Sequence, residues 1–394
     1  MGDVLTIEAI KAGDLDSEAR TAWQAFRNAR PELASPYFDL RYVLAASQVA
    51  PRAGVAVIRR ADELVGFLPF QRRGGLIQPI AAPLTDYHGL VAKPGVEIDL
   101  SAVVSALGAR RFRFAGLVGG CGQVQGEGRA AMIADLSDGF EGWLQQRRAA
   151  GHGDFLRDKR RRLRQLEAKY GKVTFTLEKR AAEVLDLVLN VKRGQMLRTG
   201  QHDIFSVRWT QALLRRLTNS TEAGFGLKFA VLRAGDKIVA AEVGLRSGDS
   251  YHLWFPIYDP DYAKYSPGAL MTMASLEALA EAGVKRVDFG PEGESYKRFF
   301  ADPMGRVLEG EVRGEPGPLR ALTYAAMEAA PPVLRRATRR LDRRLDRITA
   351  CEPELPGRVG AIMKNVALIG CRHRGLTVGA GLGLAALGVA LAAK

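Results

Sequence analysis

The chain has 394 residues, 47% hydrophobic and 25% charged, which is the balance of an ordinary folded protein and enough length for two domains. The formal net charge of +14 is high and indicates an anionic partner such as a phosphate, a nucleotide, a nucleic acid or a lipid surface. The three cysteines are scattered and exclude a disulfide framework, and the five dispersed histidines give no metal-ligand spacing, so we expect no metal ion.

The first 150 residues mix strand and helix patterns, which predicts an α/β domain of usual size. Two apolar strands, residues 55–60 and 64–70, flank a short polar turn and should form a hairpin. The other predicted strands cover residues 4–10, 77–80, 89–92 and 111–115, and the predicted helices cover residues 19–28, 37–46 and the region near Ser101.

A helix dense in arginine and lysine follows the Gly-His-Gly boundary at residues 151–153. Residues 154–170 keep one apolar face at helical spacing, and the rest of the surface is basic. Two interpretations stay open, an ordinary solvated face or a clamp on a phosphorylated or lipid-linked substrate, since arginine suits bidentate phosphate contacts. Helices at residues 184–197 and 206–217 come next.

The order of elements in the first 150 residues then appears again. Strands at residues 227–233 and 237–245 are joined by a Gly-Asp turn, and a further strand, a helix and another strand follow. We therefore predict a structural duplication.

Residues 251–300 concentrate chemically capable side chains. A strand at 284–289 stops at a Gly/Pro turn and a helix restarts at 294–300, an arrangement in which α/β folds place reactive groups. The turn gathers six polar side chains: Asp288, Glu292, Glu294, Tyr296, Lys297 and Arg298. The simpler alternative is a helix start with acids near its positive end.

Upstream of this turn, an aromatic strand at 251–258 and a loop at 259–265 lead to Ser266-Pro-Gly268 and a helix at 269–282. Ser266 is expected to cap this helix, and Pro267 suits its first turn. Gly268 leaves backbone N–H groups open to a pyrophosphate.

These motifs resemble a known family. Tyr265-Ser-Pro-Gly268, the stretch from Val287 to Lys297 and the basic helix at 158–171 are similar to the CelD/BcsL-type acetyltransferases, a branch of the GNAT superfamily tied to bacterial exopolysaccharide synthesis. The layout is also related to the FemAB aminoacyl transferases. Within the family, the chain most resembles the holdfast-polysaccharide N-acetyltransferases of stalked bacteria.

The resemblance implies an α/β fold of two tandem GNAT-like domains with a helical, basic C-terminal tail. The expected divisions are residues 1–150, a degenerate copy; 151–315, the acetyltransferase domain; and 316–394, the tail. The degenerate copy would form a wall of the acceptor groove. Asp86, Tyr87 and His88 would face that groove or belong to a capped loop.

The resemblance also implies acetyl-CoA as the donor. The superfamily's usual pyrophosphate motif is not intact, and four residues stand in its place as the expected cradle: Ser266, Pro267, Gly268 and Ala269. Backbone N–H groups of residues 254–257 are expected to stabilise the oxyanion.

Three residues are predicted to be catalytic. By resemblance, Tyr296 takes the place of the superfamily's general acid. Glu242 is the candidate base, because an isolated acid in an apolar strand should have a raised pKa, although it would face solvent if the strand faces were reversed. His252 is the second candidate base. Lys297 and Arg298 are expected to bind acceptor phosphate, and Asp288 and Glu292 to orient the acceptor sugar or fix the turn.

The tail is predicted to bind an anionic membrane surface or a ligand such as cyclic di-GMP. A leucine-rich stripe at helical spacing is surrounded by Arg335, Arg336, Arg339, Arg340, Arg343 and Arg344. A docking helix with internal ion pairs is the plainer alternative. Residues 376–393 carry no charge and are long enough for a minimal membrane span, and the preceding basic residues would keep the body cytoplasmic. A buried or loose Gly/Ala-rich tail is the alternative.

The sequence thus predicts an acyl-CoA-dependent N-acetyltransferase acting on an amino sugar or an exopolysaccharide precursor, either free or lipid-linked. No secretory signal opens the sequence, so we expect a cytoplasmic protein at the inner face of the plasma membrane. No recognised nucleic-acid motif accompanies the charge, and no specific nucleic acid is expected. The alternatives are a FemAB-like aminoacyl transferase using aminoacyl-tRNA, and a catalytically idle scaffold that binds cyclic di-GMP or membrane.

Overall fold

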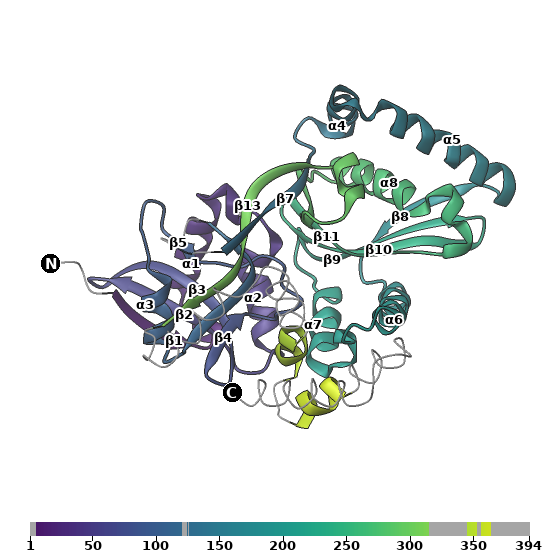
Figure 1. Cartoon of the computed structure of the whole chain (residues 1–394). Coiled ribbons are helices and arrows are strands. Elements are labelled where there is room, and N and C mark those ends of the chain that lie inside the picture. Colours follow the sequence, from purple (N-terminus) through teal and green to yellow (C-terminus); the bar gives the residue numbers. More distant parts are fainter. Residues whose placement is uncertain (1–4, 120–123, 125, 315–344, 353–355, 364–394) are drawn as a thin grey trace, which may run out of the picture.

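The structure, a computed structural model, describes residues 5–119, 124, 126–314, 345–352 and 356–363. Thirteen strands of this described part form one mixed sheet with helices on both faces (Figure 1). The strand order is β1-β2-β3-β4-β6-β13-β7-β12-β11-β10-β9-β8, and β5 pairs with β3 at the side. The predicted α/β class is confirmed.

The first half of the chain runs from β1 to β7. Its strands are β1 (Leu5–Ile10), β2 (Ala53–Arg60), β3 (Glu63–Arg73), β4 (Leu76–Pro79), β5 (Val91–Ala92), β6 (Arg111–Val118) and β7 (Gly126–Asp135). Its helices are α1 (Ser17–Asn28), α2 (Leu40–Ser47) and α3 (Leu100–Ala106).

The second half follows two connecting helices, α4 (Gly139–Arg147) and the basic α5 (Gly153–Tyr170). Its strands are β8 (Val173–Glu178), β9 (Phe225–Ala234), β10 (Lys237–Ser247), β11 (Ser250–Tyr258), β12 (Arg286–Pro291) and β13 (Asp302–Arg313). Its helices are α6 (Ala182–Thr199), α7 (Arg208–Thr218) and α8 (Pro267–Glu281).

The two halves repeat one pattern of elements. β1, α1, α2, β2, β3, β4, α3, β6 and β7 correspond in order to β8, α6, α7, β9, β10, β11, α8, β12 and β13. In each half the first four of these strands pair antiparallel in succession, and the fourth pairs parallel with the fifth, β4 with β6 and β11 with β12. The predicted duplication is confirmed.

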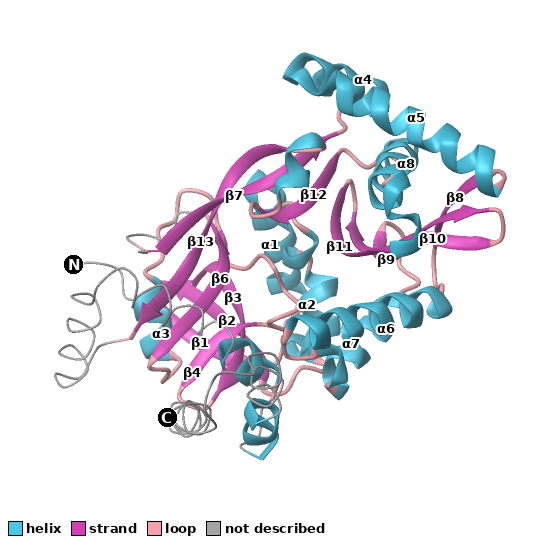
Figure 2. Cartoon of the chain, turned by 45° about the vertical axis from the view of Figure 1, so that its right-hand side comes forward, coloured by secondary structure: helices cyan, strands magenta, loops and turns pink. Residues whose placement is uncertain are grey.

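The last strand of each half is exchanged with the other half. β7 of the first half pairs with β12 of the second, and β13 of the second half pairs with β6 of the first. β7 and β13 also pair with each other, antiparallel, at the centre of the sheet. Each half therefore obtains its final strand from the other, which makes the sheet continuous (Figure 2).

Helices cover both faces of this sheet because their apolar sides have nowhere else to be buried. One core combines residues of α1, α2, α6 and α7 and so spans both halves, with Trp23, Tyr42, Val188 and Leu213 among its fully buried members. On the opposite face, α3 packs over the first half, and α4, α5 and α8 pack over the second half.

A segment of the C-terminal tail docks between the halves. Residues 345–351 are helical, and Cys351 is fully buried in the core shared by both halves. Asp346 makes an ion pair of 2.5 Å with Arg73 of β3, and the carbonyl oxygen of Cys351 accepts a 3.0 Å hydrogen bond from the Trp209 indole of α7. The predicted tail arginines, Arg335, Arg336, Arg339, Arg340, Arg343 and Arg344, and residues 376–393 lie outside the described residues.

Some predicted elements were wrong and others were missed. The helix predicted at residues 294–300 is only a short 3-10 turn, Ser295–Phe299. β7, β8, β13 and α4 were not predicted. β7 and β13 contain several glycines and charged residues, so their strand state follows from their sheet partners and not from their own composition.

Candidate active site

The site begins where β11 and β12 diverge. The two strands pair only between Ser250–His252 and Arg286–Asp288, and beyond these residues they separate. On its other side, β11 pairs with β10, and Leu253 and Phe255 lie opposite consecutive residues, so Trp254 is an extra residue in a β-bulge. A bulge leaves backbone N–H and C=O groups unpaired by the neighbouring strand, and this one lies where β11 and β12 separate.

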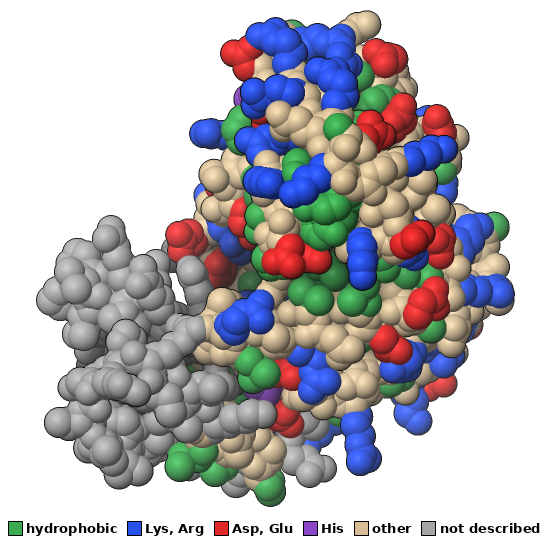
Figure 3. All heavy atoms as spheres, turned by 90° about the vertical axis from the view of Figure 1, so that its right-hand side faces the viewer, with side chains coloured by type: hydrophobic (Ala, Val, Ile, Leu, Met, Phe, Trp, Pro, Cys, Tyr) green, Lys and Arg blue, Asp and Glu red, His purple; other side chains and the backbone are tan. Residues whose placement is uncertain are grey.

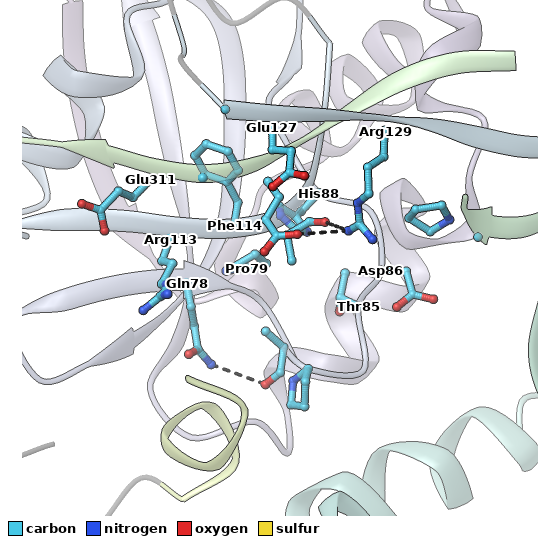
Figure 4. A pocket seen from close by; sticks show the side chains of 18 of the residues that line it. Gln78, Pro79, Thr85, Asp86, His88, Arg113, Phe114, Glu127, Arg129 and Glu311 are labelled. Carbon is cyan, nitrogen blue, oxygen red and sulfur yellow. Dashed lines mark hydrogen bonds and ion pairs between the residues drawn. The ribbon is translucent and has the colours of Figure 1, made fainter. Parts of the chain in front are cut away.

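A cleft of about 2060 Å³ lies at this opening and is lined by both halves. The second half contributes Leu253, Trp254 and the turn from Phe289 to Lys297. The first half contributes side chains from β4, β6, β7 and the connection after β4, which Figure 4 shows around one opening. Among the described lining residues, carboxylates outnumber cationic side chains, although the chain as a whole is strongly basic.

Glu242 lies just behind the cleft, on β10. It is fully buried, and the Tyr251 hydroxyl donates a 3.0 Å hydrogen bond to its Oε1. Burial raises the pKa of Glu242 to about 7, although this hydrogen bond and the charges of His252 and Lys192 oppose the shift. A carboxyl group with this pKa can exchange protons near neutral pH.

Lys192 and Tyr296 stand on the cleft side of Glu242. Both line the cleft, Lys192 from α6 and Tyr296 from the turn after β12. Burial lowers the pKa of Lys192, although the charges of Glu294 and Glu242 favour its protonated form. Burial, followed by the negative charges of Glu294 and Glu242, raises the pKa of Tyr296 to about 12, so its hydroxyl keeps its proton at neutral pH.

The other predicted substrate-binding residues are largely occupied with holding the turn. The Lys297 ammonium group donates to the carbonyl oxygen of Pro291 at 2.8 Å and pairs with Glu294 at 2.7 Å. Glu292 accepts a hydrogen bond from the backbone N–H of Ala130 on β7. Arg298 lies over the ring of Phe299 and is not among the residues that line the cleft.

His252 is buried between two carboxylates. Its Nε2 lies 2.9 Å from Oδ2 of Asp86, and its Nδ1 lies 3.7 Å from Oδ1 of Asp288. Burial lowers the pKa of His252, but these carboxylates outweigh burial and raise the pKa to about 9. The imidazole is therefore protonated at neutral pH, and this state does not suit the base predicted from the sequence.

The start of α8 is where the sequence predicted a diphosphate cradle. The N–H groups of Gly268 and Ala269 lie in the first helical turn, where no carbonyl precedes them in the helix. The nearest atom to a side chain built on Gly268 would be in the Tyr258 ring, at 3.8 Å, so the approach is open. The cations Lys159 and Arg162 of α5 border it, with Lys159 Nζ 3.2 Å from Ser266 Oγ and Arg162 bonded to the carbonyl oxygen of Lys264.

Ser266 does not cap α8 as predicted. Its backbone is in the left-handed region, with φ of 55°, and its side chain makes no capping hydrogen bond. The hydroxyl instead accepts from Lys159, so this position ties α5 to the start of α8.

Lys192 was not assigned a site role from the sequence, and Asp86 and Tyr87 were considered only as residues that would face the acceptor groove or belong to a capped loop. In the sequence, Lys192 looks like one of several cations near the end of a predicted helix. Asp86 and Tyr87 belong to a loop in the half without the transfer motifs, and no local pattern connects them to His252, which lies 166 positions away from Asp86. In the described part of the chain, no group of three or more His, Cys, Asp or Glu side chains is arranged to hold a metal ion.

Residues 153–298 match the family model described as an acetyltransferase (GNAT) domain. The chain contains a GNAT-superfamily acyltransferase domain. The matched residues include α5, the opening between β11 and β12, the start of α8 and the turn that carries Tyr296. GNAT acetyltransferases use acyl-CoA, and the open start of α8 fits its diphosphate.

Several solved structures are similar in arrangement. A tandem GNAT protein from the clavulanic acid biosynthesis pathway is 11% identical, with a TM-score of 0.46, covering 80% of this chain and 100% of that one. FemX is 10% identical, with a TM-score of 0.43 and coverages of 76% and 96%.

A C-terminal domain from Agrobacterium fabrum, described as belonging to a lysylphosphatidylglycerol synthetase, is 15% identical, with a TM-score of 0.42 and coverages of 78% and 95%. Similarities at this level say nothing of substrate. No curated protein matches the chain.

Proposed function

We propose that the chain transfers an acetyl group from acetyl-CoA to the amine of an amino sugar or of an exopolysaccharide precursor of the holdfast type. The observation that carries the proposal is the bulge at Trp254, which opens onto a cleft bordered by Tyr296 and Lys192 with Glu242 behind them. In this proposal residues 151–315 are the transferring domain and residues 1–150 form the far wall of the cleft.

The proposed reaction needs one bond made, one bond broken and two proton transfers. The acceptor nitrogen attacks the thioester carbonyl, the carbon–sulfur bond breaks, and the backbone N–H groups at the bulge stabilise the oxyanion. Glu242, with a pKa of about 7, takes the proton from the acceptor amine by way of Lys192 or water. Tyr296 gives its proton to the departing thiolate.

The charge of the cleft favours an amine as the acceptor. Because carboxylates outnumber cations among the lining residues, a cationic amino sugar enters at lower electrostatic cost than a polyphosphate or an RNA. Lys297 is already paired with Glu294 and Arg298 does not line the cleft, so we propose Lys192, in place of these two, as the contact for any acceptor phosphate. Asp288 and Glu292, which hold the turn, are proposed to position the acceptor indirectly.

Acetyl transfer by the purified full chain tests this function. With acetyl-CoA and glucosamine or its oligomers, we expect release of free coenzyme A and an acetylated sugar by mass spectrometry. N-acetylglucosamine is the matched control, because it has the same ring without a free amine, and it should give no turnover. Absence of transfer to every amine, together with transfer from aminoacyl-tRNA, would favour the FemAB-like alternative.

We also propose that α5 helps to hold the protein at an anionic membrane surface, where a lipid-linked precursor would be found. α5 lies at the top of the molecule in Figure 1, and Figure 3 shows basic side chains gathered at the top. The exposed arginines of α5 are Arg157, Arg160, Arg161 and Arg164. In the part of the chain that the structure describes, no helix combines the length and apolarity needed to cross a membrane. Cyclic di-GMP binding by the tail arginines stays a proposal about residues outside the described part.

Vesicle binding by an α5 variant tests the membrane proposal. Replacing Arg160 and Arg164 with glutamate, which reverses their charge, should weaken binding to vesicles that contain anionic lipid by at least about fivefold per arginine. Each cation near such a surface contributes about 1 kcal/mol to binding. The charge-matched control replaces Arg208 and Arg216, which are exposed on α7, with glutamate. Equal loss in both variants, or none in the α5 variant, would contradict a specific role for α5.

A further inference from the structure

The two halves differ in the connection that leads from the fourth strand of the repeated pattern, β4 or β11, to the following helix. In the second half residues 259–266 join β11 to α8, whereas in the first half residues 80–99 join β4 to α3. The longer connection lies against β6: the His88 N–H donates to the carbonyl oxygen of Gly116 at 3.0 Å, and the Val118 N–H donates to the carbonyl oxygen of His88 at 2.8 Å. We name residues 80–90 the plug loop. They lie beside β6, beyond the point where β4 and β6 separate, and the equivalent position in the second half, between β11 and β12, is where the cleft opens.

Two side chains of the plug loop reach across into the second half. The carboxylate of Asp86 lies 2.9 Å from His252 on β11, and Asp86 also lines the cleft (Figure 4). The hydroxyl of Tyr87 donates a 2.9 Å hydrogen bond to Asp288 on β12. Burial and Asp288 raise the pKa of Tyr87, so its phenol keeps the proton that it donates.

Asp288 connects this contact to the catalytic turn. The same Oδ1 that accepts from Tyr87 also accepts a 2.7 Å hydrogen bond from the backbone N–H of Gly290. Gly290 has φ of 81°, a conformation that favours glycine, and it begins the turn that leads to Tyr296. The path from the plug loop to the start of this turn consists of direct hydrogen bonds.

We propose that Asp86 and Tyr87, from the half that does not transfer the acyl group, are positioning residues of the transfer site. They act through His252 and Asp288 to fix the exit of β12 and the turn that carries Tyr296. The inference rests on the proposed function for its kinetic consequences, while its structural part is independent of which substrate is used.

The groups around His252 define what a pH measurement would report. Asp86 approaches from the plug loop and Asp288 from β12, and the rings of Tyr37 and Tyr87 lie edge-on at 5.0 and 5.8 Å. Glu242 on β10 interacts with the imidazole electrostatically. Because two of these groups are close carboxylates, removing either one should lower the pKa of His252 from about 9.

The test compares Asp86→Asn and Tyr87→Phe with Asp16→Asn in the full chain. Asp16 belongs to the same half but does not line the cleft, and its side chain accepts a hydrogen bond from the backbone N–H of Ala19 at the start of α1, which an asparagine can also accept. We expect kcat to fall about tenfold or more in the first two variants, with KM for acetyl-CoA within about twofold, and no change in Asp16→Asn. Asp86→Glu, which keeps the carboxylate, should recover part of the loss.

Nuclear magnetic resonance gives a readout that does not need turnover. The His252 titration should move to lower pH in Asp86→Asn, and the Gly290 amide signal should shift in Tyr87→Phe but not in Asp16→Asn. An unchanged His252 titration, an unchanged Gly290 signal, or a kcat loss matched by equal loss in Asp16→Asn would overturn the inference. If the wild-type chain transfers no acetyl group but these signals move as stated, the proposed function fails and the positioning contact stands.

Discussion

Replacing Tyr296 with phenylalanine is expected to lower kcat by about 100-fold to 10,000-fold, the range typical of a lost general acid. The hydroxyl lines the cleft next to the opening between β11 and β12, and its pKa of about 12 keeps it protonated throughout the working range. Removing it leaves the departing thiolate to be protonated by water. Steady-state kinetics of acetyl-CoA turnover measure the effect, and KM for acetyl-CoA should change little.

Two further measurements make the result specific. Tyr170→Phe, at the end of α5 and away from the cleft, should keep the wild-type kcat. The rate should rise with pH through about 7 in both the wild type and Tyr296→Phe, because Glu242 must lose its proton to act as a base and its pKa is about 7. Full activity in Tyr296→Phe, or a rate independent of pH between 5 and about 9, would contradict these roles.

Replacing Gly116 with alanine should destabilise the protein by about 3 kcal/mol, the upper range for overpacking a filled interior. A Cβ at this position on β6 would lie 1.8 Å from the backbone oxygen of Asp86 and 3.0 Å from its carbonyl carbon. The clash is with backbone, so no side-chain rotation relieves it, and either the plug loop or β6 must move. Chemical denaturation measures the free energy of unfolding.

Gly13→Ala is the matched control, because a Cβ there meets nothing within 4 Å and Gly13 does not have the positive φ that would strain an alanine. We expect a change below about 0.5 kcal/mol for this surface variant. Gly116→Ala should also reduce kcat, since Asp86 would no longer approach His252 correctly. Unchanged stability in Gly116→Ala would mean that the plug loop does not lie against β6 as described.

Most of the fold could be predicted from local pattern. Helical spacing and alternating apolar residues mark α1, α5 and α7 and the hairpins β2–β3 and β9–β10, and their repeated order revealed the duplication. The exchanged strands could not be found in this way. β13 starts at Asp302-Pro303 and contains Gly305 and Gly310, so its own residues favour a loop, and only pairing with β6 and β7 makes it a strand.

The candidate site was also predictable only where local sequence reveals it. Glu242 stood out because it is an isolated carboxylate within an apolar strand, and burial is what raises its pKa. Tyr296 and the glycine turn follow from a motif within a dozen residues. The protonated state of His252 depends on Asp86, a partner from the other half of the chain, and the duplication alone does not show which side chains of one half touch the other.

The exchange of β7 and β13 also sets the order in which the chain can complete its structure. Until residues 302–313 leave the ribosome, β6 and β7 lack the strand that lies between them and present unpaired edges. Contacts between partners this distant in sequence form slowly, because the entropy of closing a long loop must be lost first. Neither half should therefore mature alone during synthesis, and a chain stopped before β13 should aggregate, a failure expected of exposed strand edges and not of a weak core.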